Sequence, residues 1–430
     1  MPNASTHETI RTGTPSASLV LLAFLGFVSL GLPDAAIGVA WPSIRDSYQL
    51  RQPALGLLLV VSGLGYLASS FTYARFGRSW QIGWILSAST AMVGLAMLGF
   101  ACSPWWSVVL LCSCLHGLGS GAIDSGLNGY AAQHLPARHV LWLHAFYCAG
   151  VISGPLVMAS VFARGLTYRQ GYFWIALLLL TLSLIFRLGV TQWKGVTSAA
   201  SSSDSSISLT AALGHRIVRL QILAFFLYTG LEVAVSQWTY TILTEHRGVS
   251  SVGASAAVAL YWSGLLCGRL LVGNIVETVG CDRLVRYSLL GASFGGVLFA
   301  GSLFPIEASL FGLGLVGLGF APVFPCLMTR TPSRLGQELA TAAVGLQVGC
   351  AMSGGAVVPG ITGMIADRWG LAPASGTLAA LMIALFLLHE VLLVLPRPQP
   401  EQDVAVNQLE VLLTKTPAPM ASLETTREES

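Results

Sequence analysis

The sequence predicts an all-α, polytopic membrane protein with twelve transmembrane helices in two pseudo-symmetric bundles of six. Hydrophobic residues make up 54% of the 430-residue chain and charged residues only 10%, whereas a soluble domain carries about 25% charged residues. Apolar runs of about 20 residues, the length needed to cross a bilayer, recur twelve times along the chain. Short motifs from the first six runs return in the last six. Together these observations define the predicted fold.

Each predicted helix corresponds to one apolar span. The first six spans cover residues 16–41, 53–74, 79–101, 105–131, 140–163 and 171–190, and the last six cover 217–243, 252–276, 284–303, 306–329, 339–366 and 372–396. A Ser-rich stretch between the two sets is typical of a flexible linker. We therefore predict a cytoplasmic tail 1–15, a six-helix bundle 16–190, a cytoplasmic linker 191–216, a second bundle 217–396 and a disordered cytoplasmic tail 397–430.

The distribution of Lys and Arg predicts the orientation in the membrane. With the N-terminus inside, fifteen of the 22 Lys and Arg residues fall on the cytoplasmic side, six on the outer side and one, Arg269, within a helix. Because cations collect on the cytoplasmic side, both termini are predicted to lie there, in a multi-pass protein of the cell (inner) membrane. The net charge of +3 is small and dispersed, which argues against a nucleic-acid partner.

The two halves repeat one another in sequence. Three motifs recur at a spacing near 200 residues: Gly117-Leu-Gly as Gly317-Leu-Gly, Ser62-Gly-Leu as Ser263-Gly-Leu, and Ser153-Gly as Ser353-Gly. Parallel repeats of six helices are typical of secondary transporters, in which two halves rock around a solute bound near the middle of the membrane. The architecture therefore predicts transport, and a monomer suffices for it.

Asp124 is an ionisable residue inside the fourth span. A carboxylate at the centre of a transmembrane helix costs roughly 2.5–3.5 kcal/mol, so such residues usually serve a function. Asn128 follows one turn later on the same helix face. The position 200 residues further on is Phe324, so the acid is not repeated, which favours a coupling role over a structural one. The alternative is that Asp124 joins closely packed helices.

Asp34 is a second acid inside a predicted helix, and it directly follows Pro33. Proline removes a backbone donor and loosens the helix around it. Interrupted helices line the binding cavities of transporters, so Asp34 is predicted to contact the proton or the solute. The alternative is that it caps a helix that restarts after the proline.

The loop between the second and third spans resembles the signature loop of the major facilitator superfamily, Gly-x3-Asp-Arg-x-Gly-Arg. It reads Ser70-x3-Ala74-Arg75-Phe-Gly-Arg78, which keeps the cations but lacks the Gly and the Asp. The second-half copy, Gly273-x3-Glu277-Thr-Val-Gly, keeps the glycines and an acid. The resemblance implies that Arg75, Arg78 and Glu277 take part in gating.

Further motifs resemble the fucose permease branch of that superfamily. They are Gly31-Leu-Pro-Asp34 through Trp41, Asp124-x3-Asn128, Leu143-His144-Ala-Phe with Gly154-Pro155, Glu232-x5-Trp238, and Gly317-Leu-Gly-x-Ala-Pro-x-Phe-Pro325. Fucose permease is a proton symporter with coupling acids in helices 1 and 4. The resemblance therefore implies that Asp34 and Asp124 carry the proton.

His144 begins the fifth helix after a short turn near Pro136. A tight turn places it opposite the end of the fourth helix, where it is predicted to pair with Asp124 and to influence proton release. The alternative is a histidine bonded to the terminus of the fourth helix.

A group of polar and aromatic residues is predicted to bind the solute. Glu232 lies deep in the seventh helix, and nearby aromatic rings provide amphipathic surfaces for a polar ligand. The predicted substrate-binding residues are Asn128, Glu232, Trp238, Tyr261, Trp262 and Gln347. Arg269 lies inside the end of the eighth helix, where an unpaired cation is costly, so it is predicted to form a gating ion pair rather than to bind solute.

The sequence as a whole predicts a secondary active transporter that moves a small polar solute, such as a sugar, with protons as the coupling ion. The alternatives are a proton-antiport exporter of drugs or metabolites and a membrane sensor that binds a solute without moving it. The chain contains no catalytic, metal-binding or phosphate-binding motif. We therefore expect neither an enzyme nor a cofactor.

Overall fold

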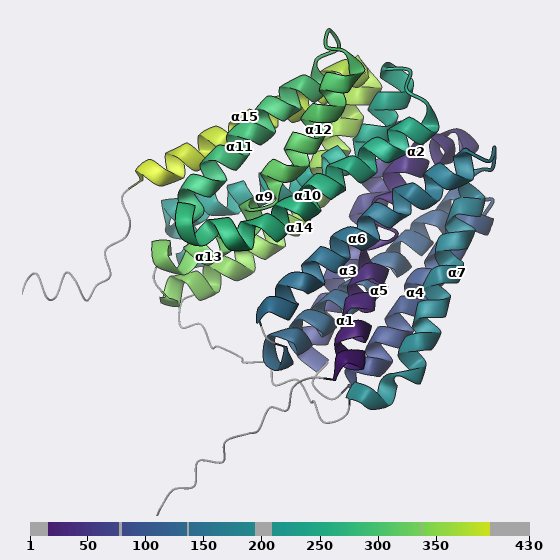
Figure 1. Cartoon of the computed structure of the whole chain (residues 1–430), viewed down its shortest axis with the longest axis horizontal. Helices are drawn as coiled ribbons and strands as arrows, with labels where there is room; N and C mark the ends of the chain where they lie inside the picture. Colours follow the sequence, from purple (N-terminus) through teal and green to yellow (C-terminus); the bar gives the residue numbers. More distant parts are fainter. Residues whose placement is uncertain (1–15, 77–79, 136, 194–208, 336, 396–430) are drawn as a thin grey trace, which may run out of the picture.

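The computed structural model describes residues 16–76, 80–135, 137–193, 209–335 and 337–395, which are helical with short connections (Figure 1). The first half contains α1 Ala17–Gly31, α2 Ala36–Ser47, α3 Ala54–Phe76, α4 Ile82–Cys102, α5 Trp106–His134, α6 Ala137–Phe162, α7 Tyr168–Leu188 and the short η2 Val190–Trp193. The second half contains α8 Leu209–Gly214, α9 Arg216–Thr241, η3 Ile242–His246, α10 Ser251–Val279, α11 Cys281–Ala300, α12 Ile306–Phe320, α13 Val323–Leu335, α14 Gln337–Trp369 and α15 Leu371–Val394.

The helices form two groups that follow the order of the chain. In Figure 1 the purple-to-teal helices α1 to α7 lie together, and the green-to-yellow helices α9 to α15 lie beside them. The two groups meet where α10 packs on α6, α3 on α14 and α2 on α9. These three contacts bring residues far apart in sequence to one central seam.

The predicted all-α membrane fold is confirmed. Within the described residues, eleven helical stretches are long and apolar enough to cross a membrane. The predicted ninth span corresponds to α11, which is outside that set. Its first turns carry Asp282, Arg283 and Arg286, yet it packs between α12 and α15 like a further member of the bundle.

The first predicted span consists of two helices. Helix α1 ends at Gly31, residues 32–35 form a turn, and α2 begins at Ala36. Pro33 has no N–H to donate, and its ring disfavours a continuous helix. The backbone N–H of Asp34 instead donates to the carbonyl of Gly31 at 3.1 Å. The expected interruption at Asp34 is therefore present.

The predicted span 306–329 is also divided, which differs from the single helix that hydropathy indicates. Helix α12 ends at Phe320 and α13 begins at Val323. Pro322 lies between them and cannot donate to the α12 ladder, so the chain breaks there. Each half of the molecule therefore contains a span that is interrupted at a proline, near Pro33 in the first half and at Pro322 in the second.

The predicted linker and tails lie largely beyond the described residues. The linker 191–216 contains most of η2 and all of α8, whereas its residues 194–208, like the tails 1–15 and 396–430, fall outside the described part of the chain. The domain limits therefore stay a prediction.

The repeated Gly-Leu-Gly motif makes the same helix contact in both halves. Gly117 on α5 abuts the backbone carbonyl of Ser62 on α3, and Gly317 on α12 abuts the backbone carbonyl of Tyr261 on α10. A Cβ atom at either glycine would overlap the facing carbonyl oxygen. These positions therefore require glycine, because the backbones of neighbouring membrane helices approach directly there.

We expect Gly317→Ala to lower the thermal stability of the protein in detergent. The new methyl group meets the Tyr261 backbone, which cannot move like a side chain, and overpacking of this kind costs about 1–3 kcal/mol. Gly314→Ala is the matched control on the same helix, because its nearest neighbour is a Leu260 side-chain carbon at 4.0 Å. Equal melting temperatures for the two variants would contradict the proposed close contact.

Candidate solute cavity

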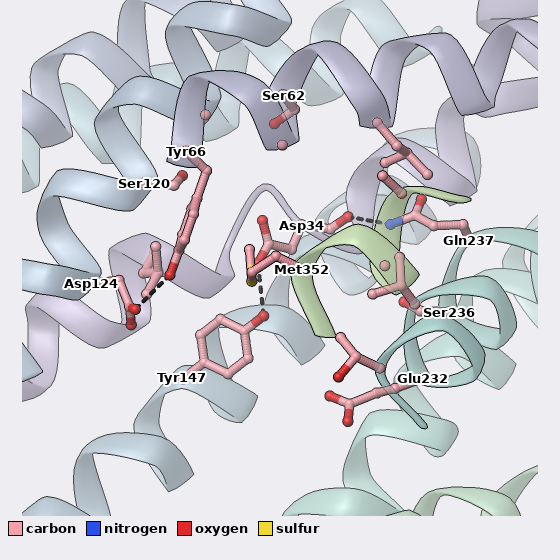
Figure 2. Close-up of a pocket in the computed structure, with 18 of the residues that line it drawn as sticks. Asp34, Ser62, Tyr66, Ser120, Asp124, Tyr147, Glu232, Ser236, Gln237 and Met352 are labelled. Atoms are coloured by element: carbon pink, nitrogen blue, oxygen red, sulfur yellow. Dashed lines mark hydrogen bonds between the residues drawn. The ribbon is translucent and has the colours of Figure 1, made fainter. Parts of the chain in front are cut away.

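A cavity of about 370 Å³ lies between the two helix groups (Figure 2). It is lined by α1, α2 and the interruption between them, by helices α3, α5 and α6 of the first half, and by α9, α10, α13 and α14 of the second half. Its polar lining includes Asp34, Ser62, Tyr66, His116, Ser120, Asp124, His144, Tyr147, Glu232, Ser236, Gln237 and Arg269. The apolar walls of the bundle thus enclose a concentrated set of hydrogen-bonding groups.

Asp34 projects from the helix interruption into this cavity. Its Oδ2 accepts a hydrogen bond from the hydroxyl of Tyr147 on α6 at 2.8 Å. Its Oδ1 lies 3.6 Å from Nε2 of His116 on α5. Its side chain is 30% exposed, so the carboxyl group is held in place by two helices and still faces the cavity.

Asp124 lies on a different wall of the same cavity. The hydroxyl of Tyr66 on α3 donates to Asp124 Oδ2 at 2.5 Å, and the amide of Asn128 donates to Oδ1 at 2.9 Å. Figure 2 shows Tyr66 extending from α3 toward Asp124 on α5. The two cavity acids therefore share one arrangement, in which a tyrosine from a neighbouring helix holds the carboxyl group.

His116 lies beside Asp34 on the helix that also carries Asp124. Its Nδ1 is 3.1 Å from the hydroxyl of Ser62, and the residue is only 5% exposed. His116, Ser120 and Asp124 are four residues apart on α5 and therefore share one face. This polar face of α5 therefore extends from His116, which lies beside Asp34, to Asp124.

The second half contributes an ion pair to the cavity. Arg269 Nη2 on α10 lies 3.8 Å from Glu232 Oε1 on α9. Arg269 Nη1 also donates to the sulfur of Cys148 on α6, at 3.2 Å. Arg269 thus contacts both halves of the molecule, so its charge is partnered within the membrane, as the cost of an isolated cation requires.

Aromatic rings form one wall of the cavity. The indole N–H of Trp262 donates to the hydroxyl of Ser236 at 2.8 Å. The ring of Trp262 meets that of Tyr147 edge to face, with 6.1 Å between centroids and an interplanar angle of 81°. Because Trp262 comes from α10 and Tyr147 from α6, this contact also crosses the two halves.

Comparison with known proteins identifies the family. The family model described as Major Facilitator Superfamily matches residues 23–359. The chain belongs to the Major Facilitator Superfamily. It is therefore a multi-pass membrane protein of a transporter family, as the sequence motifs predict.

Individual known proteins are similar to this chain along most of its length. "Bypass of stop codon protein 6" of Saccharomyces cerevisiae is 25% identical over 406 residues, which cover 86% of this chain and 81% of the yeast protein. A glucose/galactose transporter of Brucella abortus is 24% identical over 381 residues, covering 84% and 89%.

Solved structures of transporters share the fold. The nucleoside transporter NupG superimposes with a TM-score of 0.70 at 13% identity, covering 87% of this chain and 98% of NupG. The fucose:proton symporter FucP in an outward conformation gives a TM-score of 0.60 at 15% identity, covering 88% and 99%.

Six of the site residues predicted from sequence line the cavity of this superfamily member. They are Asp34, Asp124, His144, Glu232, Trp262 and Arg269. His144 differs from the expectation in its partner, because its ring meets Phe27 edge to face at 5.5 Å. The hydrogen bonds described for Asp124 come from Tyr66 and Asn128 instead.

Four predicted substrate residues lie outside the cavity lining. Trp238 is buried, and its indole N–H donates to the Pro359 carbonyl. Tyr261 is buried and donates to the Glu232 carbonyl. Gln347 is also buried, and its side chain forms hydrogen bonds with Gln221 and Thr331. Asn128 donates a hydrogen bond to the carboxyl group of Asp124. These side chains hold helices or the site acid in place.

Two of the residues predicted to gate from the signature loops, Arg75 and Glu277, lie outside the cavity lining. Arg75 is exposed and its guanidinium lies over the Phe76 ring, Glu277 is exposed, and Arg78 is outside the described residues. Beside the second loop copy, Asp282 forms ion pairs with Arg330 at 2.8 Å and Arg334 at 2.9 Å. This charge cluster joins α11 to α13.

Sequence reasoning missed several cavity residues. Tyr66 and Tyr147, which bind the two acids, are amphipathic aromatics with no charge to draw attention. His116 is buried and belongs to no motif that marks it as a site residue, and Gln237 is a neutral residue next to the more prominent Trp238. The one usable signal was spacing, because His116 lies two turns before Asp124 on the same face.

Ion pairs join the two halves on the side of the molecule opposite the start of α1 and the end of α15, which are the chain ends of the described part. Arg45 at the end of α2 lies 3.0 Å from Glu245 in η3. Arg51, just before α3, pairs with Asp367 near the end of α14. Trp41 and Gln52 are linked by a hydrogen bond of 3.0 Å beneath these pairs. The halves are therefore fastened together on that side of the cavity.

We expect a double-mutant cycle to show that Arg269 and Glu232 are energetically coupled. Arg269→Met leaves the Glu232 carboxylate without its cation, and Glu232→Gln leaves the cation without its carboxylate. The double variant removes both charges, so it is expected to be less destabilised than the sum of the single variants by about 1–3 kcal/mol. Thermal unfolding in detergent measures the cycle, and additive losses would contradict the coupling.

Proposed function

We propose that this protein is a proton-coupled secondary transporter that moves a small polar, sugar-like solute by alternating access. The observation that carries the proposal is the presence of Asp34 and Asp124 in one intramembrane cavity, each held by a tyrosine hydroxyl. Both acids are accessible to a solute that enters the cavity. Proton binding and solute binding therefore take place in one compartment.

The chemistry of the two acids supports proton coupling. Each carboxylate is costly inside the membrane, and binding a proton removes its charge. The transition between outward and inward access moves the cavity walls relative to one another, so it is easier with neutral acids than with charged ones. In this scheme the proton binds Asp34 or Asp124 on the side of higher proton activity and is released after the halves have moved.

The lining of the cavity supports a solute with several hydroxyl groups. Within the described residues, Ser120 Oγ and Thr229 Oγ1 are buried without a hydrogen-bond partner, and both residues line the cavity. Buried polar atoms generally find a partner, so a bound solute that offers donors and acceptors satisfies them. The Trp262 and Tyr147 rings provide the apolar surface that a sugar ring packs against.

Some of the similar proteins carry solutes of this class, and another, NupG, is a nucleoside transporter. Proteins similar to this chain include one named a glucose/galactose transporter and one whose structure is titled a fucose:proton symporter. The cavity volume of about 370 Å³ lies in the usual range of about 300–1,000 Å³ for small-molecule sites. These similarities support a monosaccharide or a solute of similar size and polarity.

The orientation of the protein is part of the same proposal. The bias of Lys and Arg places both termini in the cytoplasm of a cell with the protein in its inner membrane. The Arg45–Glu245 and Arg51–Asp367 pairs then lie on the outer side. In this proposal they hold the outer side closed while the cavity is accessible from the cytoplasm. A monomer contains the complete cavity.

We expect solute-driven proton movement in liposomes that contain the purified protein. Addition of glucose, galactose or fucose to one side is expected to move protons in the same direction as the solute, which a pH-sensitive dye records. Asp34→Asn and Asp124→Asn remove the proton-binding groups, so each is expected to reduce this signal by about a hundredfold or more, the lower end of the loss typical of a proton-transfer group.

The matched control for this experiment is Glu307→Gln. Glu307 is an exposed acid in the first turn of α12, away from the cavity, so the same chemical change is expected to leave the signal intact. Solute uptake without proton movement in the unmodified protein would contradict proton coupling. Full proton movement in both aspartate variants would contradict the assignment of the acids.

A further inference from the structure

The interruption in the first helix leaves a backbone carbonyl that the second half of the molecule uses. Helix α2 begins at Ala36, so the carbonyl of Asp34 lies outside its hydrogen-bond ladder. The side-chain amide of Gln237 on α9 donates to this carbonyl through Nε2 at 2.9 Å (Figure 2). The residue that carries a cavity acid is therefore bonded to the opposite half through its main chain.

Gln237 is held rigidly against the interruption. It is only 5% exposed, and the backbone of α2 touches it directly, since a Cβ at Gly38 would lie 2.6 Å from the Gln237 Cα. Its neighbours along α9 are also fixed, because Ser236 accepts from Trp262 and Trp238 donates to Pro359. The amide therefore has little freedom to find another partner.

The same two elements are joined again farther from the cavity. Eight residues beyond Gln237, Glu245 pairs with Arg45, which lies eleven residues beyond Asp34. The seam between α2 and the end of α9 thus runs from a hydrogen bond at the cavity to an ion pair on the side opposite the chain ends. Gln237 occupies the cavity end of this seam.

We infer that Gln237 is a positioning residue that links the Asp34 segment to closure of the molecule on the side opposite the chain ends. Its Nε2 fastens the Asp34 carbonyl across the two halves. Its Oε1 is buried without a hydrogen-bond partner within the described residues, and a Cβ at Gly38 would lie 2.8 Å from it, so the whole amide packs against α2. This inference rests on the proposed alternating-access function but concerns a different measurable step.

The test measures closure directly and needs no solute. Spin labels are attached at Leu166 and Leu303, two exposed positions in loops on that side of the two halves. A keto-bearing amino acid carries each label, so the native cysteines stay in place. The unmodified protein is expected to give mainly the shorter distance. Gln237→Leu is expected to add a longer-distance population, raising the ratio of open to closed forms about three- to tenfold.

Gln221→Leu is the matched control. Gln221 is a buried glutamine on the same helix that accepts a hydrogen bond from Gln347 outside the cavity. It is expected to lower the melting temperature without changing the distance distribution. A distribution for Gln237→Leu that matches the unmodified protein, or an equal shift in Gln221→Leu, would overturn the inference.

Gln237→Glu tests the donor role without a change of shape. A protonated glutamic acid can donate to the Asp34 carbonyl, whereas an ionised one cannot. The longer-distance population of this variant is therefore expected to grow as the pH rises, beyond any change seen in Gln237→Leu. Among the described residues, the other ionisable groups that line this cavity, which both variants share, are Asp34, Tyr66, His116, Asp124, His144, Tyr147, Tyr228, Glu232 and Arg269. An identical pH response in the two variants would overturn the donor role.

The distance measurement and the proton-movement measurement test the two proposals separately. If liposomes show no proton movement but Gln237→Leu still opens the molecule, proton coupling is wrong and the Gln237 link stands. If proton movement occurs but the distances do not change, the link is wrong and the proposed function stands.

Discussion

The interruption of the first helix at Pro33 is the constraint on which the functional architecture depends. Because proline cannot continue the helical ladder, the chain turns at residues 32–35 and presents two groups of Asp34 in different directions. The carboxyl group faces Tyr147 and His116 in its own half, whereas the backbone carbonyl faces Gln237 in the other half. A continuous helix would use that carbonyl internally and would leave the halves without this bond.

The polar cavity is stable within an apolar protein because most of its charges are paired or hydrogen-bonded. Asp124 is bonded by Tyr66 and Asn128, and Arg269 is shared between Glu232 and Cys148. Buried charges tolerate a low-dielectric interior only under such conditions. Among the cavity-lining residues that the structure describes, the side-chain atoms buried without a hydrogen-bond partner are the hydroxyls of Ser120, Tyr228 and Thr229, the amide oxygen of Gln237 and Nε2 of His116.

The fold could be predicted from the sequence because the apolar bilayer requires apolar spanning helices, and the two halves repeat the same short motifs. A helix that crosses a bilayer must be apolar over its length, so the spans were visible without any structure. Ionisable residues in those spans, such as Asp34, Asp124, Glu232 and Arg269, were visible for the same reason. Tyr66, Tyr147 and Gln237 were missed because neutral amphipathic side chains fit a membrane helix whether or not they face a cavity. Trp238 and Tyr261 were predicted to bind the solute but are buried outside the cavity lining. Sequence spacing alone does not show which face of α9 or α10 is buried.

In the proposed mechanism, a proton gradient drives the movement of solute through this cavity. The most direct measurement imposes a pH difference across liposomes that hold the protein, with the same concentration of labelled galactose on both sides. If one proton moves with each galactose, the sugar is expected to accumulate in the more alkaline compartment by about tenfold per pH unit, because one pH unit is equivalent to about 1.36 kcal/mol. A protonophore is expected to abolish the accumulation. Galactose that equilibrates across the membrane but does not accumulate under the gradient would contradict the account.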